Sequence, residues 1–165
     1  MRSDDVRRRC FAPRARTPIV RVNLARHGRS VITSISNKGL MRWMVFKGAL
    51  DARHFKKFLV RLVRTTKHKV FLIVDNLRVH HAKVLVPYLE KNMPRIELFF
   101  LPSYSPELNP VEVANADLKQ AIGKLAPARQ ELQMTKASDT HLRSVQRRPA
   151  HVIEYFLHPD VYYAA

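Results

Sequence analysis

Hydrophobic and polar residues alternate along the chain in blocks that predict strands and helices from residue 30 onward. Two β-prone runs, at 30–36 and 40–46, flank Asn37, Lys38 and Gly39. Asparagine and glycine readily take the positive φ angles that tight turns need, so these runs predict a β-hairpin.

After Asp51 the hydrophobic pattern changes to the period of a helix. Apolar residues then recur at intervals of three and four, which places them on one face: Phe55, Phe58, Leu59, Leu62 and Val63. Asp51 precedes them and can accept hydrogen bonds from the first backbone N–H groups. We therefore expect an amphipathic helix capped by Asp51.

Two continuous apolar runs, at 70–74 and 96–101, predict strands that are buried on both faces of a sheet. Between them, apolar residues at helical spacing predict a helix: Val79, Ala82, Val86 and Leu89. Strand, helix and strand in this order form a right-handed βαβ unit with parallel strands. The carboxyl ends of both strands then lie at one edge of the sheet, where binding sites form in α/β folds.

The rest of the chain predicts irregular segments and short helices. Three prolines keep the stretch before the next helix out of regular structure: Pro102, Pro106 and Pro110. Helices are expected at 110–124, 136–146 and 150–156. We predict one α/β domain over 1–165, with a basic arm at 1–18 and a helical tail at 126–165.

The chain is strongly basic, since its 165 residues include 30 Lys and Arg against 13 Asp and Glu, a formal charge of +17. The basic residues are scattered rather than gathered on one amphipathic helix, which favours a nucleic acid over a membrane surface as the partner. No apolar run is long enough to span a membrane, and the single cysteine, Cys10, excludes an internal disulfide. We expect a cytoplasmic protein with no small-molecule substrate.

Two carboxylates are the strongest candidates for catalysis. Asp75 follows the apolar run at 70–74, and Glu112 lies in the first turn of the helix expected at 110–124, with 36 residues between the two. The βαβ connection brings both to one edge of the sheet. Carboxylates that converge without His or Cys suit Mg²⁺ or Mn²⁺, and a pair of such ions supports phosphodiester chemistry. With the basic charge, this pattern indicates a nuclease or strand transferase acting on DNA or RNA.

Both carboxylates also have structural interpretations, which stay open at this point. Glu112 can complete a capping box with Asn109, with Pro110 as the first helical residue. Asp75 can begin a turn after its strand. Either structural role is compatible with catalysis.

Other polar residues carry two interpretations as well. His80 and His81 are adjacent on the expected helix and point in different directions, so we expect them to cap, pack or contact phosphate rather than share a zinc ion. Basic residues near the site are either phosphate contacts or solvated surface: Lys119, Lys124, Arg143, Arg147 and Arg148. Trp43 and the phenylalanines are expected in the core.

Several strings closely resemble the catalytic domain of bacterial insertion-sequence transposases of the mariner superfamily. They are VFLIVDNLRVHHA, IELFFLPSYSPELNPVE and DLKQAIGK, with RARTPIVRV near the start and RRPAHVIEYFLHPDVYYAA at the end. The resemblance implies an RNase H-like α/β fold, with helices flanking a mixed sheet, and three carboxylates that hold two Mg²⁺ or Mn²⁺ ions. It implies cleavage of transposon ends and transfer of the freed 3′ hydroxyl to target DNA, in a bacterial protein associated with the nucleoid. A homo-oligomer is one partner that the sequence leaves open.

The resemblance also assigns residues. Asp75 matches the second carboxylate and Glu112 the third. Five further positions match the motif as support for the site: Asn76, His80, Tyr104, Pro106 and Asn109. Lys119 matches a motif position too.

The chain departs from this family pattern at its start. The strand with the first catalytic Asp has no match, Asp4 and Asp5 come too late in the chain, and the N-terminal helix-turn-helix region is absent. Ala114 and Ala116 replace bulkier or more polar residues. We therefore expect a truncated transposase that lacks its first strand, leaves a strand edge unpaired and has doubtful activity alone.

Two other functions remain open. The first is a non-catalytic basic module that binds DNA or interferes with full-length transposase. The second is an RNase H-like RNA nuclease or another α/β phosphohydrolase.

Overall fold

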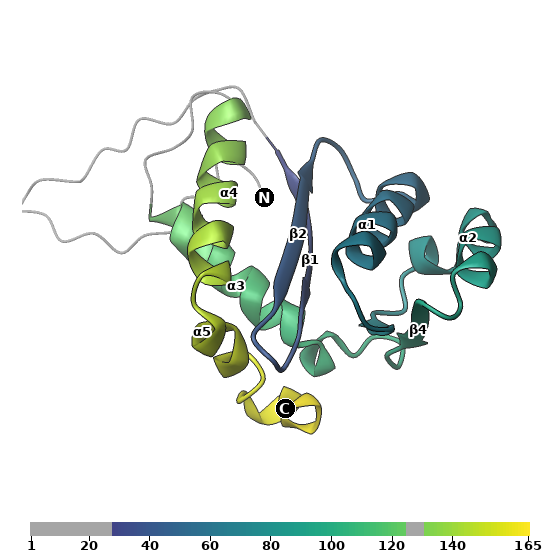
Figure 1. The fold of residues 1–165 in the computed structure, drawn as a ribbon. Coiled ribbons are helices and arrows are strands. Elements are labelled where there is room, and N and C mark those ends of the chain that lie inside the picture. The colour runs from purple at the N-terminus through teal and green to yellow at the C-terminus, as the bar shows by residue number, and fades with distance from the viewer. Residues whose placement is uncertain (1–27, 125–130) are drawn as a thin grey trace, which may run out of the picture.

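The computed structural model describes residues 28–124 and 131–165. The basic arm predicted at 1–18, the RARTPIVRV segment, Asp4, Asp5 and Cys10 lie outside these ranges. Figure 1 shows the arrangement of the described helices and strands.

The predicted hairpin forms, with β1 (Ser30–Ile35) antiparallel to β2 (Met41–Phe46). Gly39 in the connecting turn has a φ of 78°, in the region that favours glycine. A Cβ atom at this position would lie 2.6 Å from Cβ of Pro149. Glycine is therefore required both by the turn and by the close packing of the hairpin tip on the C-terminal part of the chain.

Helix α1 (Ala52–Thr65) matches its prediction, including the cap. The Asp51 carboxylate accepts a hydrogen bond of 2.7 Å from the backbone N–H of His54. The five apolar residues named for this helix are all buried. They pack against β2 and against the second pair of strands, so α1 joins the two halves of the fold.

The βαβ unit is present, because β3 (Val70–Val74) and β4 (Ile96–Phe100) pair in parallel. Its connection is less regular than predicted. The single helix expected around Val79 to Leu89 is replaced by two 3₁₀ turns, Arg78–His81 and Lys83–Leu85, followed by the short helix α2 (Val86–Lys91). Pro87 lacks a backbone N–H, so it fits the first turn of α2 but not the interior of a longer helix.

The prediction that the parallel strands are buried on both faces was wrong. Side chains of β3 alternate between exposed and covered, with Phe71 63% and Ile73 50% exposed. Val70, Leu72 and Val74 face α1 and the βαβ connection, whereas no described helix covers the other face. Phe99 and Phe100 of β4 are exposed as well, so the expectation that the phenylalanines lie in the core holds only for some of them.

Three helices and a 3₁₀ turn complete the described chain: α3 (Pro110–Gly123), α4 (Glu131–Gln146), α5 (Pro149–Glu154) and the turn Pro159–Ala164. Helix α4 begins earlier than predicted, and the last turn was not predicted. Figure 1 shows the β1–β2 sheet between α1 on one side and α3 and α4 on the other. A second core cluster lies under these helices and includes Met41, Leu118, Leu142 and Val152.

The strands do not form the single mixed sheet that we expected. Within the described ranges, β1–β2 and β3–β4 are two separate two-stranded sheets. The molecule is of the mixed α/β class, as predicted, with helices beside small sheets.

Candidate active site

A cavity of about 470 Å³ separates the two sheets, and we call it the carboxylate cavity. It is lined by residues 31–37, from β1 and the following turn, and by residues 71–75, from β3 and its end. Successive residues of a strand point to opposite faces, so a cavity that meets consecutive residues borders the strand's edge. The carboxylate cavity therefore lies between the edge of β1 that faces away from β2 and the edge of β3 that faces away from β4.

The structure brings Asp75 and Glu112 to this cavity. Asp75 directly follows β3, where the chain leaves the parallel pair, and Glu112 lies in the first turn of α3. The chain between them runs through the connection to β4 and the proline-containing loop. Two carboxylates that are distant in sequence thus share one lining.

His80 packs beside Asp75 and contacts its backbone. The imidazole is only 7% exposed, lies against the ring of Phe55 and has its Nδ1 atom 2.9 Å from the backbone oxygen of Asp75. Nδ1 is also 2.9 Å from Oδ1 of the same residue, within ion-pair distance. The hydrogen bond of acceptable geometry is the one to the carbonyl, and Oδ1 is buried without one. We therefore assign the N–H to the carbonyl, and the contact with Oδ1 to proximity alone.

A second buried oxygen lies in the same lining. Oγ1 of Thr33, on β1, has no hydrogen-bond partner. Among the described residues, this atom and Oδ1 of Asp75 are the two buried side-chain atoms in that condition. Buried polar atoms are normally satisfied, so these two oxygens, on residues that line one cavity, are exceptions to that rule.

Glu112 does not form the capping box with Asn109 that was its structural interpretation. Asn109 caps α3, since its Oδ1 atom accepts a hydrogen bond of 3.1 Å from the backbone N–H of Val111. The backbone N–H of Asn109 donates to Pro106 instead of to the Glu112 side chain. The Glu112 carboxylate accepts one hydrogen bond, of 3.3 Å, from the side-chain amide of Asn115, which also lines the cavity. Glu112 is otherwise exposed and available to a ligand.

The remaining motif residues build the loops around the site. Asn76 donates a hydrogen bond of 2.9 Å to Ser103 and shares another with His81, so it ties the end of β3 to the loop after β4. His81 also stacks on Phe100. His80 and His81 thus have separate partners, as expected. Pro106 begins a 3₁₀ turn before α3.

Tyr104 in the same loop has a fully exposed side chain and a φ of 58°. A non-glycine residue in this region carries a local strain of about 1 kcal/mol. The C-terminal turn supports the loop from the other side, because the Tyr163 hydroxyl donates a hydrogen bond of 2.7 Å to the carbonyl of Leu108. Tyr163 and Phe156 also line the cavity, and sequence reasoning missed both.

The basic residues predicted to contact phosphate do not gather at the carboxylate cavity. Lys119, Lys124 and Arg147 are exposed and lie outside its lining. Arg148 donates a hydrogen bond of 3.2 Å to the carbonyl of Ser144. Arg143 lines a different cavity, beside β2.

Trp43, expected in the core, is half-buried, and its indole N–H donates to Asp139.

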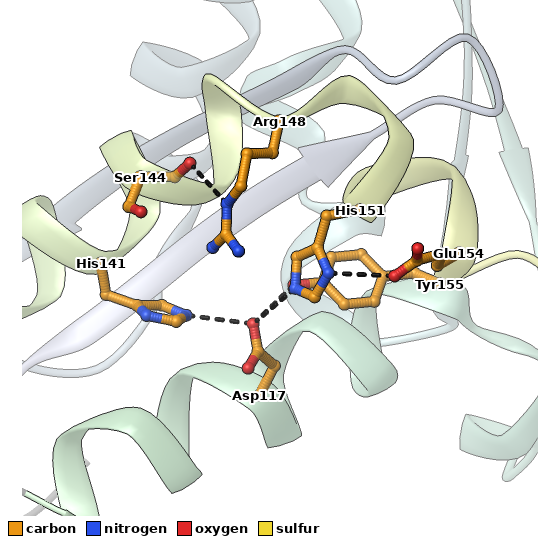
Figure 2. Close-up of polar contacts among 7 residues, drawn as sticks. All are labelled: Asp117, His141, Ser144, Arg148, His151, Glu154 and Tyr155. Atoms are coloured by element: carbon orange, nitrogen blue, oxygen red, sulfur yellow. Dashed lines mark hydrogen bonds and ion pairs between the residues drawn. The ribbon is translucent and has the colours of Figure 1, made fainter.

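A polar cluster that the sequence did not predict joins α3, α4 and α5, and we call it the Asp117 hub. Figure 2 shows the Asp117 carboxylate facing His141, His151 and Tyr155. Its Oδ2 atom lies 3.1 Å from His141 Nε2 and 3.5 Å from His151 Nε2, and it accepts a hydrogen bond of 2.6 Å from the Tyr155 hydroxyl. His151 Nδ1 in turn lies 3.1 Å from Glu154.

These contacts shift two pKa values. Partial burial raises the pKa of Asp117, but the hydrogen bond from Tyr155 and the interactions with His141 and His151 outweigh it, so the pKa lies below 3.8. Burial raises the pKa of the Tyr155 phenol well above its ordinary value, and the hydrogen bond to Asp117 and the charge of that residue raise it further. The hub is a set of mutually satisfied groups, which indicates a structural role.

The residues of the carboxylate cavity are suited to a divalent ion but do not surround one. Asp75 has a side chain that is 40% exposed, and Glu112 has an exposed carboxylate, both of the hard oxygen type that Mg²⁺ prefers. In the described ranges, no three His, Cys, Asp or Glu side chains are grouped so that they could hold a metal ion. The described chain thus supplies two carboxylates to the cavity and no third.

The described helices include none with the length and apolar character needed to cross a membrane. A model of the family described as DDE superfamily endonuclease matches residues 1–134, which contain both carboxylates and the loops around them. No curated protein matches the chain.

Proposed function

The chain belongs to the DDE superfamily endonuclease family, and we propose that Asp75 and Glu112 are the second and third carboxylates of a transposase site. Its reactions are hydrolytic cleavage of DNA at transposon ends and transfer of the 3′ hydroxyl to target DNA, as in bacterial insertion sequences of the mariner superfamily. The observation that carries the proposal is the shared cavity, which Asp75 and Glu112 both line although 36 residues separate them in the sequence.

Two divalent ions, when bound, would supply activation of the attacking oxygen and stabilisation of the leaving oxygen. Asp75 and Glu112 would hold them. His80 positions Asp75 through its backbone carbonyl, and Oδ1 of the carboxylate has no hydrogen bond from the described residues. Asn109 fixes the first turn of α3 and with it the position of Glu112.

The described residues bring no third carboxylate to the carboxylate cavity. Three carboxylates neutralise and fix an ion pair, and removing one of them cripples such sites. We propose that the activity of this chain depends on a third carboxylate supplied to the carboxylate cavity. The segment that holds Asp4 and Asp5 is one source, and a second polypeptide is another.

The test is nicking of supercoiled DNA in Mn²⁺, measured for the chain and for Asp75→Asn. Asp160→Asn serves as a control, since Asp160 is an exposed carboxylate at the C-terminal turn, outside the cavity. Metal-dependent nicking that is lost in Asp75→Asn and kept in Asp160→Asn supports a complete site. Equal nicking by all three proteins overturns the assignment of Asp75.

An inactive chain leads to a second measurement. A peptide that carries one Asp within an extended apolar segment is added, with an Asp→Ala peptide as control. Nicking restored by the Asp peptide alone supports the proposed need for a third carboxylate. Continued inactivity with DNA still bound overturns the proposed catalytic function and supports the alternative below.

A second candidate function rests on the formal charge of +17 together with only two carboxylates in the described lining. On this alternative the chain binds DNA without cleaving it and interferes with complete transposases by joining their assemblies. DNA binding that needs no divalent ion and survives Asp75→Asn is then expected. Loss of binding in EDTA would contradict it.

A further inference from the structure

A second cavity, of about 320 Å³, lies beside β2, and we call it the arginine groove. It is lined by four consecutive residues of β2, by one residue of α1 and by four of α4: Arg42, Trp43, Met44, Val45, Arg61, Thr135, Asp139, Arg143 and Gln146. The run of consecutive β2 residues means that the groove borders the edge of that strand. This is the edge that faces away from β1, so the groove and the carboxylate cavity lie on opposite edges of the β1–β2 sheet.

The groove concentrates positive charge from three elements that are distant in sequence. Of the described residues, Arg42, Arg61 and Arg143 line it, against one carboxylate, Asp139. Arg29 lies next to the groove without lining it, since its Nε atom donates a hydrogen bond of 2.9 Å to the hydroxyl of Thr135. Neighbouring guanidinium groups repel one another, so an arrangement of this kind is most stable with an anion between them.

The frame of the groove is held by hydrogen bonds between α4 and β2. The Trp43 indole N–H donates to Asp139 at 2.9 Å, and the Gln146 amide donates to the carbonyl of Met41 at 2.9 Å. Arg42 also uses one N–H on the Met41 carbonyl, at 2.9 Å, which leaves the rest of its guanidinium for a ligand. Arg61 and Arg143 lie on exposed helix faces, α1 on one side of the sheet and α4 on the other (Figure 1).

We propose that the arginine groove binds phosphate groups of the DNA backbone, at a place separate from the carboxylate cavity. Guanidinium groups match phosphate oxygens through two parallel hydrogen bonds. The inference rests on the proposed function in that DNA is the substrate. It adds that a DNA duplex passes along the outer edge of β2, between α1 and α4, while its reacting bond lies at the other edge of the sheet.

The first test measures binding of a labelled random-sequence DNA duplex in EDTA, over a range of salt concentrations. The variant Arg61→Gln/Arg143→Gln is compared with Arg64→Gln/Lys91→Gln, which removes the same charge from exposed positions outside the groove. Each lost phosphate contact lowers the slope of log K against log salt by roughly 0.9. We expect the groove variant to lose about 2 from the slope and at least tenfold in affinity, and the control to lose much less.

Asp139 provides a test with the opposite sign. Asn at this position can still accept the hydrogen bond from Trp43, so the frame is kept while the one negative charge of the lining is removed. We expect Asp139→Asn to tighten DNA binding by severalfold at low salt. Weaker or unchanged binding, with an unaltered melting temperature, would overturn the inference.

Other outcomes separate this inference from the proposed function. Equal weakening in the two double variants means that the groove is ordinary basic surface, and displacement of the duplex by low concentrations of inorganic phosphate means a site for a free anion. Both overturn the inference. Normal binding by the groove variant, with nicking lost only in Asp75→Asn, overturns the inference and keeps the function. Weak DNA binding by the groove variant, with nicking unaffected by Asp75→Asn, overturns the proposed catalytic function and keeps the inference about the arginine groove.

Discussion

The carboxylate cavity and the Asp117 hub each centre on an aspartate, and the two aspartates are in opposite conditions. Asp117 receives contacts from His141, His151 and Tyr155, all through one carboxylate oxygen. Asp75 has a buried oxygen that receives no hydrogen bond from the described residues, and Thr33, which lines the same cavity, has a second such oxygen. The Asp117 carboxylate thus has partners among the described side chains. His80, the neighbour of Asp75, forms its hydrogen bond with the backbone carbonyl of Asp75 and not with the carboxylate.

This difference separates two uses of a polar group inside a protein. A satisfied carboxylate between helices stabilises their packing, and its removal leaves the donors around it without an acceptor. A carboxylate held without donors costs stability in the free protein and gains when a cation or a donor arrives. We infer that the Asp117 hub fixes α3, α4 and α5, whereas the carboxylate cavity is arranged for a ligand. Three predictions test this contrast, in order of decreasing effect.

The largest effect is expected from Asp117→Ala. This change leaves three polar side chains, on α4, on α5 and directly after α5, without their shared partner, so we expect the free energy of unfolding to fall by about 2–3 kcal/mol. Urea unfolding at neutral pH measures it. Asp160→Ala is the matched control, because Asp160 pairs with His158 at the exposed C-terminal turn and should cost less than about 0.5 kcal/mol. Equal losses of stability in the two variants would contradict a structural role for the Asp117 hub.

A smaller effect is expected from the titration of Tyr155. Because its pKa is raised in the folded state, the phenol contributes stability that is fully present below pH 10, the ordinary value. That contribution is lost as the pH rises above 10, at up to about 1.4 kcal/mol for each pH unit. Unfolding free energies of the chain and of Tyr155→Phe are compared from neutral to alkaline pH. The chain should lose stability faster than the variant above pH 10, and parallel curves would contradict the assignment.

The elements that the sequence predicted well depend on local patterns. The hairpin required Gly39 in its turn, α1 followed from five apolar residues and a capping aspartate, and the parallel pairing followed from the βαβ order. The position of Glu112 in the first turn of α3 followed from Asn109 and Pro110 in the same way. Each of these predictions involves residues within one or two turns, or a topological rule with few exceptions.

The features that the sequence did not reveal depend on which elements meet. Phe71 and Ile73 lie in an unbroken apolar run, and only the positions of the helices show that one face of β3 is uncovered. The hub joins residues that are 24 to 38 positions apart. One signal was available, because Asp117 lies on the same face of α3 as the buried residues Ala114 and Leu118. The arginine groove had no such signal, since its three arginines belong to three different elements.

The smallest effect, and the one with the opposite sign, is expected from Thr33→Val. The change replaces a buried hydroxyl that has no partner by a methyl group of similar size, so we expect the free energy of unfolding to rise by about 1 kcal/mol. Thr66→Val is the control, because the Thr66 hydroxyl donates a hydrogen bond of 2.8 Å to the carbonyl of Leu62 and its loss should destabilise the chain. Urea unfolding of both variants measures whether the free energy of unfolding rises or falls in each. Destabilisation by Thr33→Val equal to that of the control would mean that the hydroxyl is satisfied in the free protein, and the contrast between the cavity and the hub would fail at that residue.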